Sequence, residues 1–375
     1  MSQDNKQKRV VIKIGSSSLT SQHGEMSRRK LENLVDEIVQ VKEAGHEVLL
    51  VSSGAVAAGY RKLGCLSRPE SLPEKQAAAS IGQGLLIEAY SDLLLSHGYV
   101  GSQILITRSD FSDEKRYNNA RNTINVLLER GIIPIVNEND TVTIDRLKFG
   151  DNDTLSAKVA GLVSADMLII LSDIDGLYND DPRKNPNAKL LDRVEEITDD
   201  IEDMAGEPGS SVGTGGMRSK IDAFKIAMAS GIPAFLGKAG VPNILKDAVE
   251  YEATGTYFEA PNDMENLNQK KQWIAFNSGP KGDVVLNHRA KKYVIDKEEP
   301  ILLKDIYHVQ GTFTAGDVVR IQHIEGDEVG LGVVNFTSDD LKSYAENEQY
   351  SQSKDIAVKR EHLVCHLDVS IPMGV

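Results

Sequence analysis

The 375-residue sequence contains only two cysteines, Cys65 and Cys365, and they stand in no metal-ligand spacing. Their scarcity excludes a disulfide scaffold and fits a reducing compartment, so we expect a cytoplasmic protein. The sequence also lacks an apolar run of about 18 residues, and its polar start, MSQDNKQKR, leads straight into a strand-like segment. We therefore expect neither a membrane span nor a signal peptide.

Several common motifs are missing as well. There is no Walker A sequence, no GxGxxG fingerprint and no heptad or solenoid repeat. The charge balance is 42 basic against 56 acidic residues, a net charge of −14. An acidic chain is poorly suited to non-specific binding of nucleic acid or anionic membrane. With 40% apolar residues the chain can build a real core, and its length favours two domains.

Apolar runs alternate with amphipathic stretches from residue 10 to about 240. This alternation, with runs too uniformly apolar for a one-sided sheet, predicts an α/β/α sandwich with a mainly parallel central sheet. The predicted strands are residues 10–14, 47–52, 102–107, 132–136, 166–172 and 232–236. The predicted helices are residues 27–44, 74–96, 116–130, 153–164 and 216–230.

The composition changes near residue 255 to a polar stretch with glycine and proline. Beyond it come short strand-like pieces separated by acidic or glycine turns, namely DVVLN, KYVI, TFTAGDVVRIQH and VGLGVVNF. We therefore predict a first domain over residues 1–260, a linker over 261–279 and a small β-rich domain over 280–375.

The carboxyl ends of five predicted strands carry small, polar or glycine residues. Those ends read GSSS, SSGAVAAG, NEND, SDIDG and GKAG. In an open parallel sheet ligands bind in the crevice outside these ends, although loops are commonly polar without a ligand. Lys13 lies one residue before such an end. Because an unpaired buried cation is costly, Lys13 either marks a strand edge in water or meets a negative partner in the crevice.

Two glycine-rich loops, IGSSS (14–18) and VGTGGMRSK (212–220), are candidates for binding an anion. Backbone N–H groups in such loops permit close approach, and the second loop opens an amphipathic helix whose N-terminus favours negative charge. Lys220 lies about one turn into that helix, within reach of a phosphate. The alternative is an ordinary glycine turn with a solvated lysine.

Two acidic segments could each have a purely structural role. In GDNDTLSAK (150–158), Asp151 or Asp153 could simply cap the following helix, a role worth about 1 kcal/mol. Three polar residues in succession exceed what a cap needs, so we expect one to be free for a site. The segment SDIDGLYNDDPR (172–183) lacks the glutamate spacing of an EF-hand, which disfavours dedicated calcium binding.

Taken in order, these motifs resemble the amino acid kinase family. The resemblance rests on KIGSSSL, VSSGAVAAG, NENDTV, FGDNDTLSA, LSDIDGLYNDDPR and GTGGMRSK, and the β-rich domain resembles a PUA module. Within that family the chain is similar to the members that phosphorylate the γ-carboxylate of L-glutamate with ATP, which starts proline biosynthesis. The resemblance covers essentially the whole chain, whereas single motifs are shared with kinases for other small metabolites.

The resemblance implies a role for each motif residue. Lys13 and Lys220 would contact the transferring phosphate, and Asp153 would hold both lysines. ATP would be bound by Lys13, Ser172, Asp173, Thr214, Gly215, Gly216, Met217, Arg218, Ser219 and Lys220. Glutamate would be held by Ser53, Asn137, Asp140 and Asn152. Magnesium would accompany ATP without a protein metal site, and family members suggest a homotetramer, feedback inhibition by proline and coupling to glutamyl phosphate reductase.

Elementary chemistry agrees with that assignment. Phosphoryl transfer between anions needs alignment and positive charge more than covalent chemistry, and a carboxylate acceptor needs no general base. Without the resemblance, the residues indicate only a kinase of a small anionic metabolite, and another acceptor, such as acetylglutamate, is the alternative. RNA binding by the PUA-like module is disfavoured, because residues 281–375 carry eleven Lys/Arg against sixteen Asp/Glu, a net charge of −5.

Overall fold

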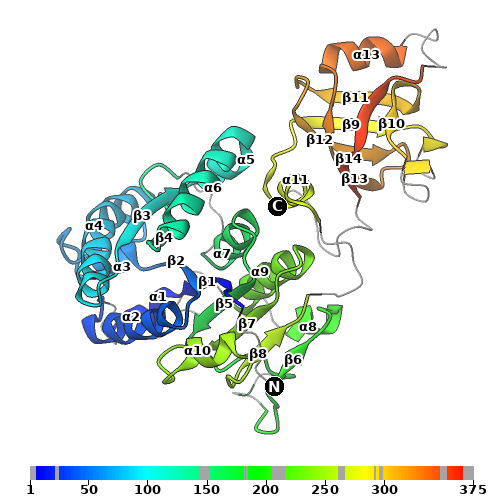
Figure 1. Cartoon of the computed structure of the whole chain (residues 1–375). Coiled ribbons are helices and arrows are strands. Elements are labelled where there is room, and N and C mark those ends of the chain that lie inside the picture. The colour runs from blue at the N-terminus through cyan, green and yellow to red at the C-terminus, as the bar shows by residue number, and fades with distance from the viewer. Residues whose placement is uncertain are drawn as a thin grey trace. The chain divides into compact units, whose positions relative to one another are not determined.

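A computed structural model describes most of the chain. The described residues are 6–21, 25–143, 152–180, 182, 185–204, 216–260, 267–290, 293–294, 299–346 and 353–365. The chain forms two compact units (Figure 1). The first comprises residues 1–110 and 115–264, and the second comprises residues 111–114 and 265–375.

The first unit is built on an eight-stranded sheet in the order β3-β4-β2-β1-β5-β7-β8-β6. Its strands pair in parallel, except that β8 runs antiparallel to β7. The predicted mainly parallel sheet is thereby confirmed. The strands are β1 (Arg9–Ile14), β2 (Glu47–Val51), β3 (Gly101–Ile106), β4 (Ile133–Glu138), β5 (Met167–Ser172), β6 (Arg193–Val194), β7 (Ala234–Lys238) and β8 (Thr256–Phe258).

Helices cover this sheet, and the five long ones follow the predicted amphipathic stretches. In Figure 1 α7 and α9 lie together on one face, and α2 and α10 lie on the other. Among the described residues no helix combines the length and apolarity that a membrane crossing requires. The helices are α1 (Ser16–Leu19), α2 (Arg28–Glu43), α3 (Ala55–Gly59), α4 (Leu72–Ser96), α5 (Arg108–Ser112), α6 (Glu114–Glu129), α7 (Asn152–Leu162), α8 (Asp199–Met204), α9 (Met217–Ala229) and α10 (Ile244–Val249).

Strand β1 lies at the centre of the sheet, between β2 and β5. Successive side chains on a strand point to opposite faces. Val10, Ile12 and Ile14 belong to the core formed with α2, α4 and α10. Lys13 therefore points to the other face, where α7 packs on β1. A central strand has no free edge, so the water-exposed alternative for Lys13 is excluded.

The second unit contains a six-stranded sheet in the order β10-β14-β13-β12-β9-β11 with its own apolar core. This separate β-rich unit confirms the fold class predicted for the C-terminal region. Its elements are β9 (Gly282–Leu286), β10 (Ile301–Leu302), a 3₁₀ turn (Leu303–Asp305), β11 (Ile306–Gly311), β12 (Val318–His323), β13 (Glu328–Val334), α13 (Ser338–Glu346) and β14 (Ile356–Cys365). The strand prediction for KYVI is wrong at Tyr293 and Val294, which are helical. A short apolar run does not distinguish helix from strand.

A helical segment lies near the start of the C-terminal part of the second unit. It consists of α11 (Gln269–Gln272) and the π-helical turn Trp273–Asn277, and it buries Trp273, Ile274 and Phe276. Phe111 stands more than 150 residues earlier in the sequence, but it belongs to the same unit and is 2% exposed. Its carbonyl accepts a 2.9 Å hydrogen bond from Trp273 Nε1. Part of the stretch predicted as a linker is thus well-packed helix.

Candidate active site

Lys13 occupies the end of β1 and is almost fully buried, with 5% of its surface exposed. Its Nζ forms an ion pair with Asp153 Oδ1. The lysine is therefore tolerated in the strand because it meets a carboxylate at the strand's carboxyl end.

Asp153 is the second residue of α7 and has no exposed surface. Burial raises the pKa of this carboxyl, but the ammonium groups of Lys13 and Lys220 outweigh burial and hold the pKa below its ordinary value. The carboxylate is thus ionised and shared between two cations. Asp151, the other residue considered as a helix cap, lies outside the described residues.

Lys220 comes from α9, on the same face of the sheet as α7. Its Nζ lies 3.0 Å from Asp153 Oδ2, and the residue is 6% exposed. Ser219 Oγ lies 3.1 Å from the same carboxylate oxygen and 2.8 Å from the carbonyl oxygen of Gly216. The start of α9 is therefore fixed to the start of α7. Of the residues predicted to bind ATP here, Thr214 and Gly215 lie outside the described part.

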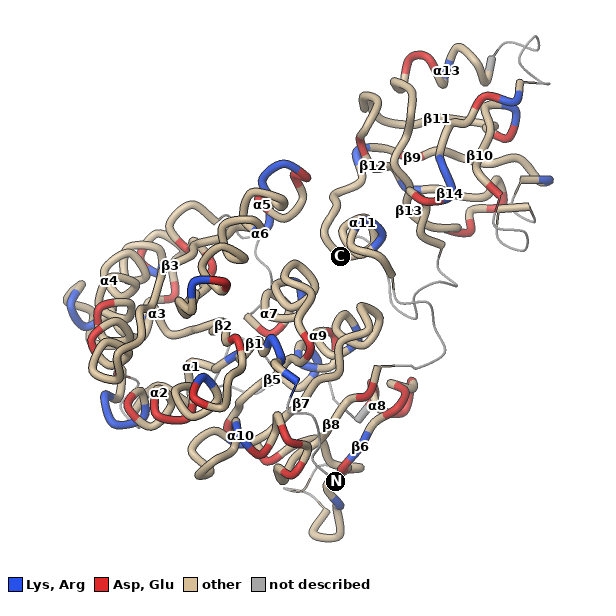
Figure 2. Tube along the Cα trace, viewed as in Figure 1, with Lys and Arg blue, Asp and Glu red and all other residues tan. Residues whose placement is uncertain are grey.

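Arg218 and Met217 also begin α9, and Arg218 faces an acidic helix. Arg218 Nη2 lies 2.7 Å from Glu202 Oε2 and Nε lies 3.6 Å from Asp222 Oδ1. Glu202 belongs to α8, which Figure 2 shows as a strongly acidic segment, and it also pairs with Lys225. With 44% of its side chain exposed, Arg218 keeps access to solvent while its guanidinium is anchored.

Ser172 and Asp173 follow at the carboxyl end of β5, the neighbour of β1. Ser172 Oγ donates a 3.0 Å hydrogen bond to Asp173 Oδ1, and the Ser172 carbonyl accepts one of 2.7 Å from the N–H of Ala239. The hydrogen bond from Ala239 connects the end of β5 to the segment after β7. The predicted nucleotide-binding residues Ser172 and Asp173 therefore lie on the carboxyl edge of the sheet, beside the Lys13 strand.

Three residues predicted to hold the amino acid meet around one side chain. Asn152 Nδ2 lies 2.9 Å from Ser53 Oγ, 2.9 Å from Asn137 Oδ1 and 2.6 Å from the Ser52 carbonyl oxygen. Asn137 Nδ2 in turn donates a 2.8 Å hydrogen bond to Gln83 Oε1. Sequence reasoning did not identify Gln83, because a glutamine within a helical pattern carries no signal of its own.

Close packing of α3 against α4 accounts for the position of Gln83. A Cβ on Gly82 would lie 1.8 Å from the Ala55 carbonyl oxygen, and one on Gly59 would lie 1.9 Å from that of Ala78. Both positions therefore admit only glycine, and their backbones can touch. The packing holds α3, which directly follows Ser53, against the helix that carries Gln83.

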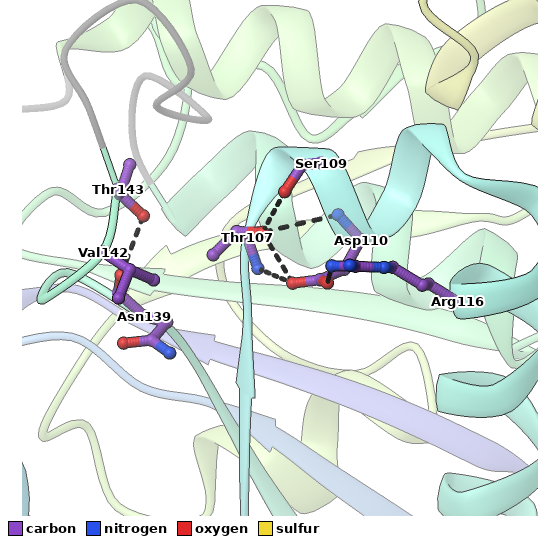
Figure 3. A pocket seen from close by; sticks show the side chains of 7 residues that line it. All are labelled: Thr107, Ser109, Asp110, Arg116, Asn139, Val142 and Thr143. Carbon is purple, nitrogen blue, oxygen red and sulfur yellow. Dashed lines mark hydrogen bonds and ion pairs between the residues drawn. The ribbon is translucent and has the colours of Figure 1, made fainter.

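Asp140, the remaining residue predicted to bind glutamate, lies half-buried in the turn after β4. Asn139 and Thr143 of this loop border a polar pocket of about 370 Å³ at the carboxyl ends of β3 and β4. Figure 3 shows its side chains, which are Thr107, Ser109, Asp110, Arg116, Asn139, Val142 and Thr143. The pocket places hydroxyl, amide and charged groups next to the Asp140 loop.

The charged pair of this pocket is internally bonded. Asp110 accepts hydrogen bonds from Thr107 N and Oγ1, at 2.8 and 2.6 Å, and lies 3.0 Å from Arg116 Nη1. Burial raises the pKa of Asp110, but the bonds from Thr107 and the Arg116 guanidinium outweigh it and hold the pKa below its ordinary value. The pocket therefore presents an ionised, oriented carboxylate.

Known proteins are similar to this chain over most of its length. The Amino acid kinase family matches residues 8–238, and the PUA domain matches residues 282–351. The chain is 64% identical to Glutamate 5-kinase 2 of Bacillus licheniformis, over 98% of this chain and 99% of that protein. It is 62% identical to Glutamate 5-kinase 2 of Bacillus subtilis over all of both chains. Glutamate 5-kinase of Streptococcus pneumoniae is 43% identical over 95% of each.

A solved structure supports the fold. Carbamate kinase from Giardia lamblia bound to AMP-PNP superposes with a TM-score of 0.50 at 17% identity, covering 68% of this chain and all of that one. At this identity the likeness speaks for the fold alone. The matches along the sequence establish that the chain belongs to the amino acid kinase family and carries a C-terminal PUA domain.

Proposed function

We propose that the chain is a glutamate 5-kinase, which transfers the γ-phosphoryl group of ATP to the γ-carboxylate of L-glutamate. The product is L-glutamyl 5-phosphate, and the reaction is the first step of proline biosynthesis. The observation that carries the proposal is the pair of buried ammonium groups, Lys13 and Lys220, held by one carboxylate. The identity of 62–64% to glutamate 5-kinases over nearly the whole chain supports the choice of acceptor.

The two lysines supply what the transition state needs. Negative charge spreads over the transferring group, and preorganised cations in a water-poor site stabilise it. The Asp153 carboxylate offsets part of the free energy that burial of the two ammonium groups costs, and it fixes their positions. Because α7 and α9 each contribute a residue to this cluster, the geometry is set by helix packing before ATP arrives.

For the acceptor, glutamate, the protein needs only to bind the molecule and orient its γ-carboxylate. A γ-carboxylate is ionised at neutral pH, so it attacks without a general base, and none of the predicted site residues is a histidine. In the hydrogen-bonded group of Ser53, Asn137 and Asn152, the Ser53 hydroxyl and the second proton of Asn137 Nδ2 are the donors for the carboxylates of glutamate. Asp140 offers a carboxylate for the substrate ammonium, and the polar pocket beside its loop gives the amino acid a place to enter.

Magnesium would reach the site with the ATP phosphates. Within the described residues of the first unit there is no group of three side chains spaced to hold a metal ion. Asp173 and Ser172 supply oxygen atoms of the kind that Mg²⁺ and its bound waters prefer. Bound Mg²⁺ would neutralise phosphate charge, while Lys13 and Lys220 act from the protein side.

An acceptor panel tests the proposal. The purified chain is supplied with ATP and Mg²⁺, and ADP release is measured with L-glutamate, L-aspartate, N-acetylglutamate, carbamate and UMP. We expect turnover with L-glutamate to exceed that with every other acceptor by at least about 100-fold in kcat/KM, since a site built on hydrogen bonds rejects mismatched groups strongly. Preference for another acceptor would overturn the assignment while leaving the kinase fold intact.

The remaining properties follow from the same resemblance. We propose a cytoplasmic homo-oligomer, with the tetramer as its expected form, that is inhibited by proline and supplies glutamyl phosphate reductase. Light scattering gives the subunit number, and the glutamate assay with added proline gives the inhibition. Transfer of the acyl phosphate is tested by adding the reductase together with a hydride donor, and the reductase should consume the product before it reaches bulk solution.

RNA binding by the PUA domain is the competing function. Figure 2 shows acidic and basic segments interspersed over the second unit, and the net charge of residues 281–375 is negative. Phosphate contacts dominate affinity for nucleic acid, so we expect no salt-dependent RNA affinity. A filter-binding titration across salt concentrations distinguishes the two, because a steep salt dependence would add RNA as a partner.

A further inference from the structure

The turn between β12 and β13 gathers metal-binding side chains far along the chain from the kinase motifs. A ring nitrogen of His323 and one carboxylate oxygen each of Glu325 and Asp327 lie within 4.8 Å of one another. The spacing is fixed by the backbone: His323 N donates to the Asp327 carbonyl at 2.7 Å, and Gly326 N donates to the His323 carbonyl at 2.8 Å. Gly326 adopts φ +96°, which makes this turn available at little cost.

A second imidazole stands beside the turn. His288 follows β9, which pairs in parallel with β12, so that His323 is in register with Leu286. His288 Nδ1 lies 3.8 Å from Glu325 Oε1, while His323 Nδ1 lies 3.4 Å from Glu325 Oε2. The two rings meet edge to face with centroids 5.5 Å apart. Glu325 is therefore flanked by an imidazole at each of its oxygens.

The buried imidazole is poorly satisfied by protein groups. His323 is 4% exposed, and among the described residues its Nε2 has no hydrogen-bond partner. The other nitrogen, Nδ1, accepts a 3.4 Å hydrogen bond from the backbone N–H of Glu325 and lies 3.4 Å from Glu325 Oε2, and both distances are long for a hydrogen bond. Burying a polar ring without good partners is costly, and a cost of this kind calls for an explanation such as an unseen ion.

We propose that His323, Glu325 and Asp327, joined by His288, bind a divalent transition-metal ion, with Zn²⁺ as the best fit. Imidazole with carboxylate is a ligand set for zinc and its neighbours rather than for Mg²⁺ or Ca²⁺. Ligands about 2.0–2.1 Å from one ion at tetrahedral angles lie about 3.3 Å from each other. The 3.4 Å spacing between His323 and Glu325 is close to that value, whereas it is poor for a hydrogen bond.

The ion would act as a cross-link within the second unit. It would join the segment after β9, through His288, to the β12–β13 turn. With 69% of its side chain exposed, His288 is free to move the short distance that closes the set. Two carboxylates and two neutral imidazoles would balance the charge of a divalent cation. The inference is independent of the kinase reaction, because none of these residues belongs to the site described above.

Zinc titration of the full-length chain tests the proposal. Calorimetry is run in excess Mg²⁺ so that sites made of oxygen atoms alone are occupied. We expect one Zn²⁺ site per chain, with affinity lowered at least about tenfold in Glu325→Gln and in His288→Ala. Glu361→Gln and His308→Ala, two exposed residues of the same unit, are matched controls and should bind as the parent does. Equal affinity in all four variants, or no saturable binding, would overturn the proposal.

Two further measurements separate this site from other zinc ligands. With Co²⁺ in place of Zn²⁺, nitrogen and oxygen ligands give visible bands without thiolate charge transfer, so such charge transfer would point to Cys65 or Cys365 instead. Thermal unfolding supplies a readout without catalysis, since an ion bound only to the folded chain raises the melting temperature. Zn²⁺ should raise it equally in the parent and in Glu361→Gln but by less in Glu325→Gln, and an equal rise in all three would contradict the assignment.

Discussion

Lys13, at the end of a central strand, forms an ion pair with Asp153, which has no exposed surface at all. A carboxylate so deeply buried is stable only because two ammonium groups neutralise it. The same arrangement leaves two cations at the carboxyl edge of the sheet, where a bound phosphate would lie. The ion pairs that stabilise the buried carboxylate therefore also position the two cations for the proposed phosphoryl transfer.

In the proposed reaction Asp140 binds the ammonium group of glutamate and does not contact ATP. Replacing Asp140 by Asn removes the charge that would meet the substrate ammonium, so the KM for glutamate should rise about 30- to 150-fold, equivalent to about 2–3 kcal/mol. The KM for ATP should change little. Asp173→Asn is the reciprocal control, because it should raise the KM for ATP and leave that for glutamate. Equal effects on both substrates in either variant would give that residue a structural role.

Lys158 makes the stability of the first unit depend on pH. Burial, together with the charge of Arg108, lowers the pKa of Lys158 from 10.5 to about 7. The unfolded chain keeps this proton up to its ordinary pKa, so between these two values it binds more protons than the folded chain. This group therefore makes the free energy of unfolding increase as pH rises from 7, by at most about 1.4 kcal/mol per pH unit.

Urea unfolding at pH 7 and pH 9 measures this contribution. Lys158→Met should lose the rise between the two values, whereas Lys62→Met, which changes an exposed lysine of the same unit, should keep it. The same increase in both variants would show that Lys158 titrates at its ordinary value.

The domain boundary is tested by shortening the chain. A chain ending at residue 260 retains every predicted site residue but leaves Phe111 without Trp273 and the other residues of the second unit. Exposed apolar surface of this kind promotes association. We therefore expect the shortened chain to aggregate, and its Phe111→Ser variant to remain monodisperse in light scattering and active with glutamate. A folded, monodisperse but inactive variant would show that the C-terminal residues complete the site.

The central sheet was predictable because its strands are continuous apolar runs ending in polar residues. The second unit was harder for a physical reason. Strand β11 shows no clean alternation, since the register shifts between Ile306 and His308, and β14 carries the charged run KREH within its length. Such irregular strands are fixed by their partners rather than by their own pattern.

Within the site, the sequence could indicate residue types but not their partners. The Lys13, Asp153 and Lys220 cluster was expected from motif order, and the structure supplies its geometry. Gln83 and the pairing of Arg218 with Glu202 could not be foreseen, because both depend on which helices pack together. Close approaches such as that of Gly59 to α4 are set by tertiary structure, and isolated glycines do not reveal them.

The steady-state rate and melting temperature of Lys13→Met test the central claim most directly. Methionine keeps the apolar stem of lysine, and Lys220 still neutralises Asp153, so the melting temperature should be unchanged or higher. Losing one preorganised cation at the developing charge should lower kcat about 10²- to 10³-fold, with little change in the KM for glutamate. Lys220→Met should behave alike, while Lys62→Met should leave both quantities unchanged. A Lys13→Met variant that is destabilised yet fully active would show that the buried lysine serves the fold and not the phosphoryl transfer.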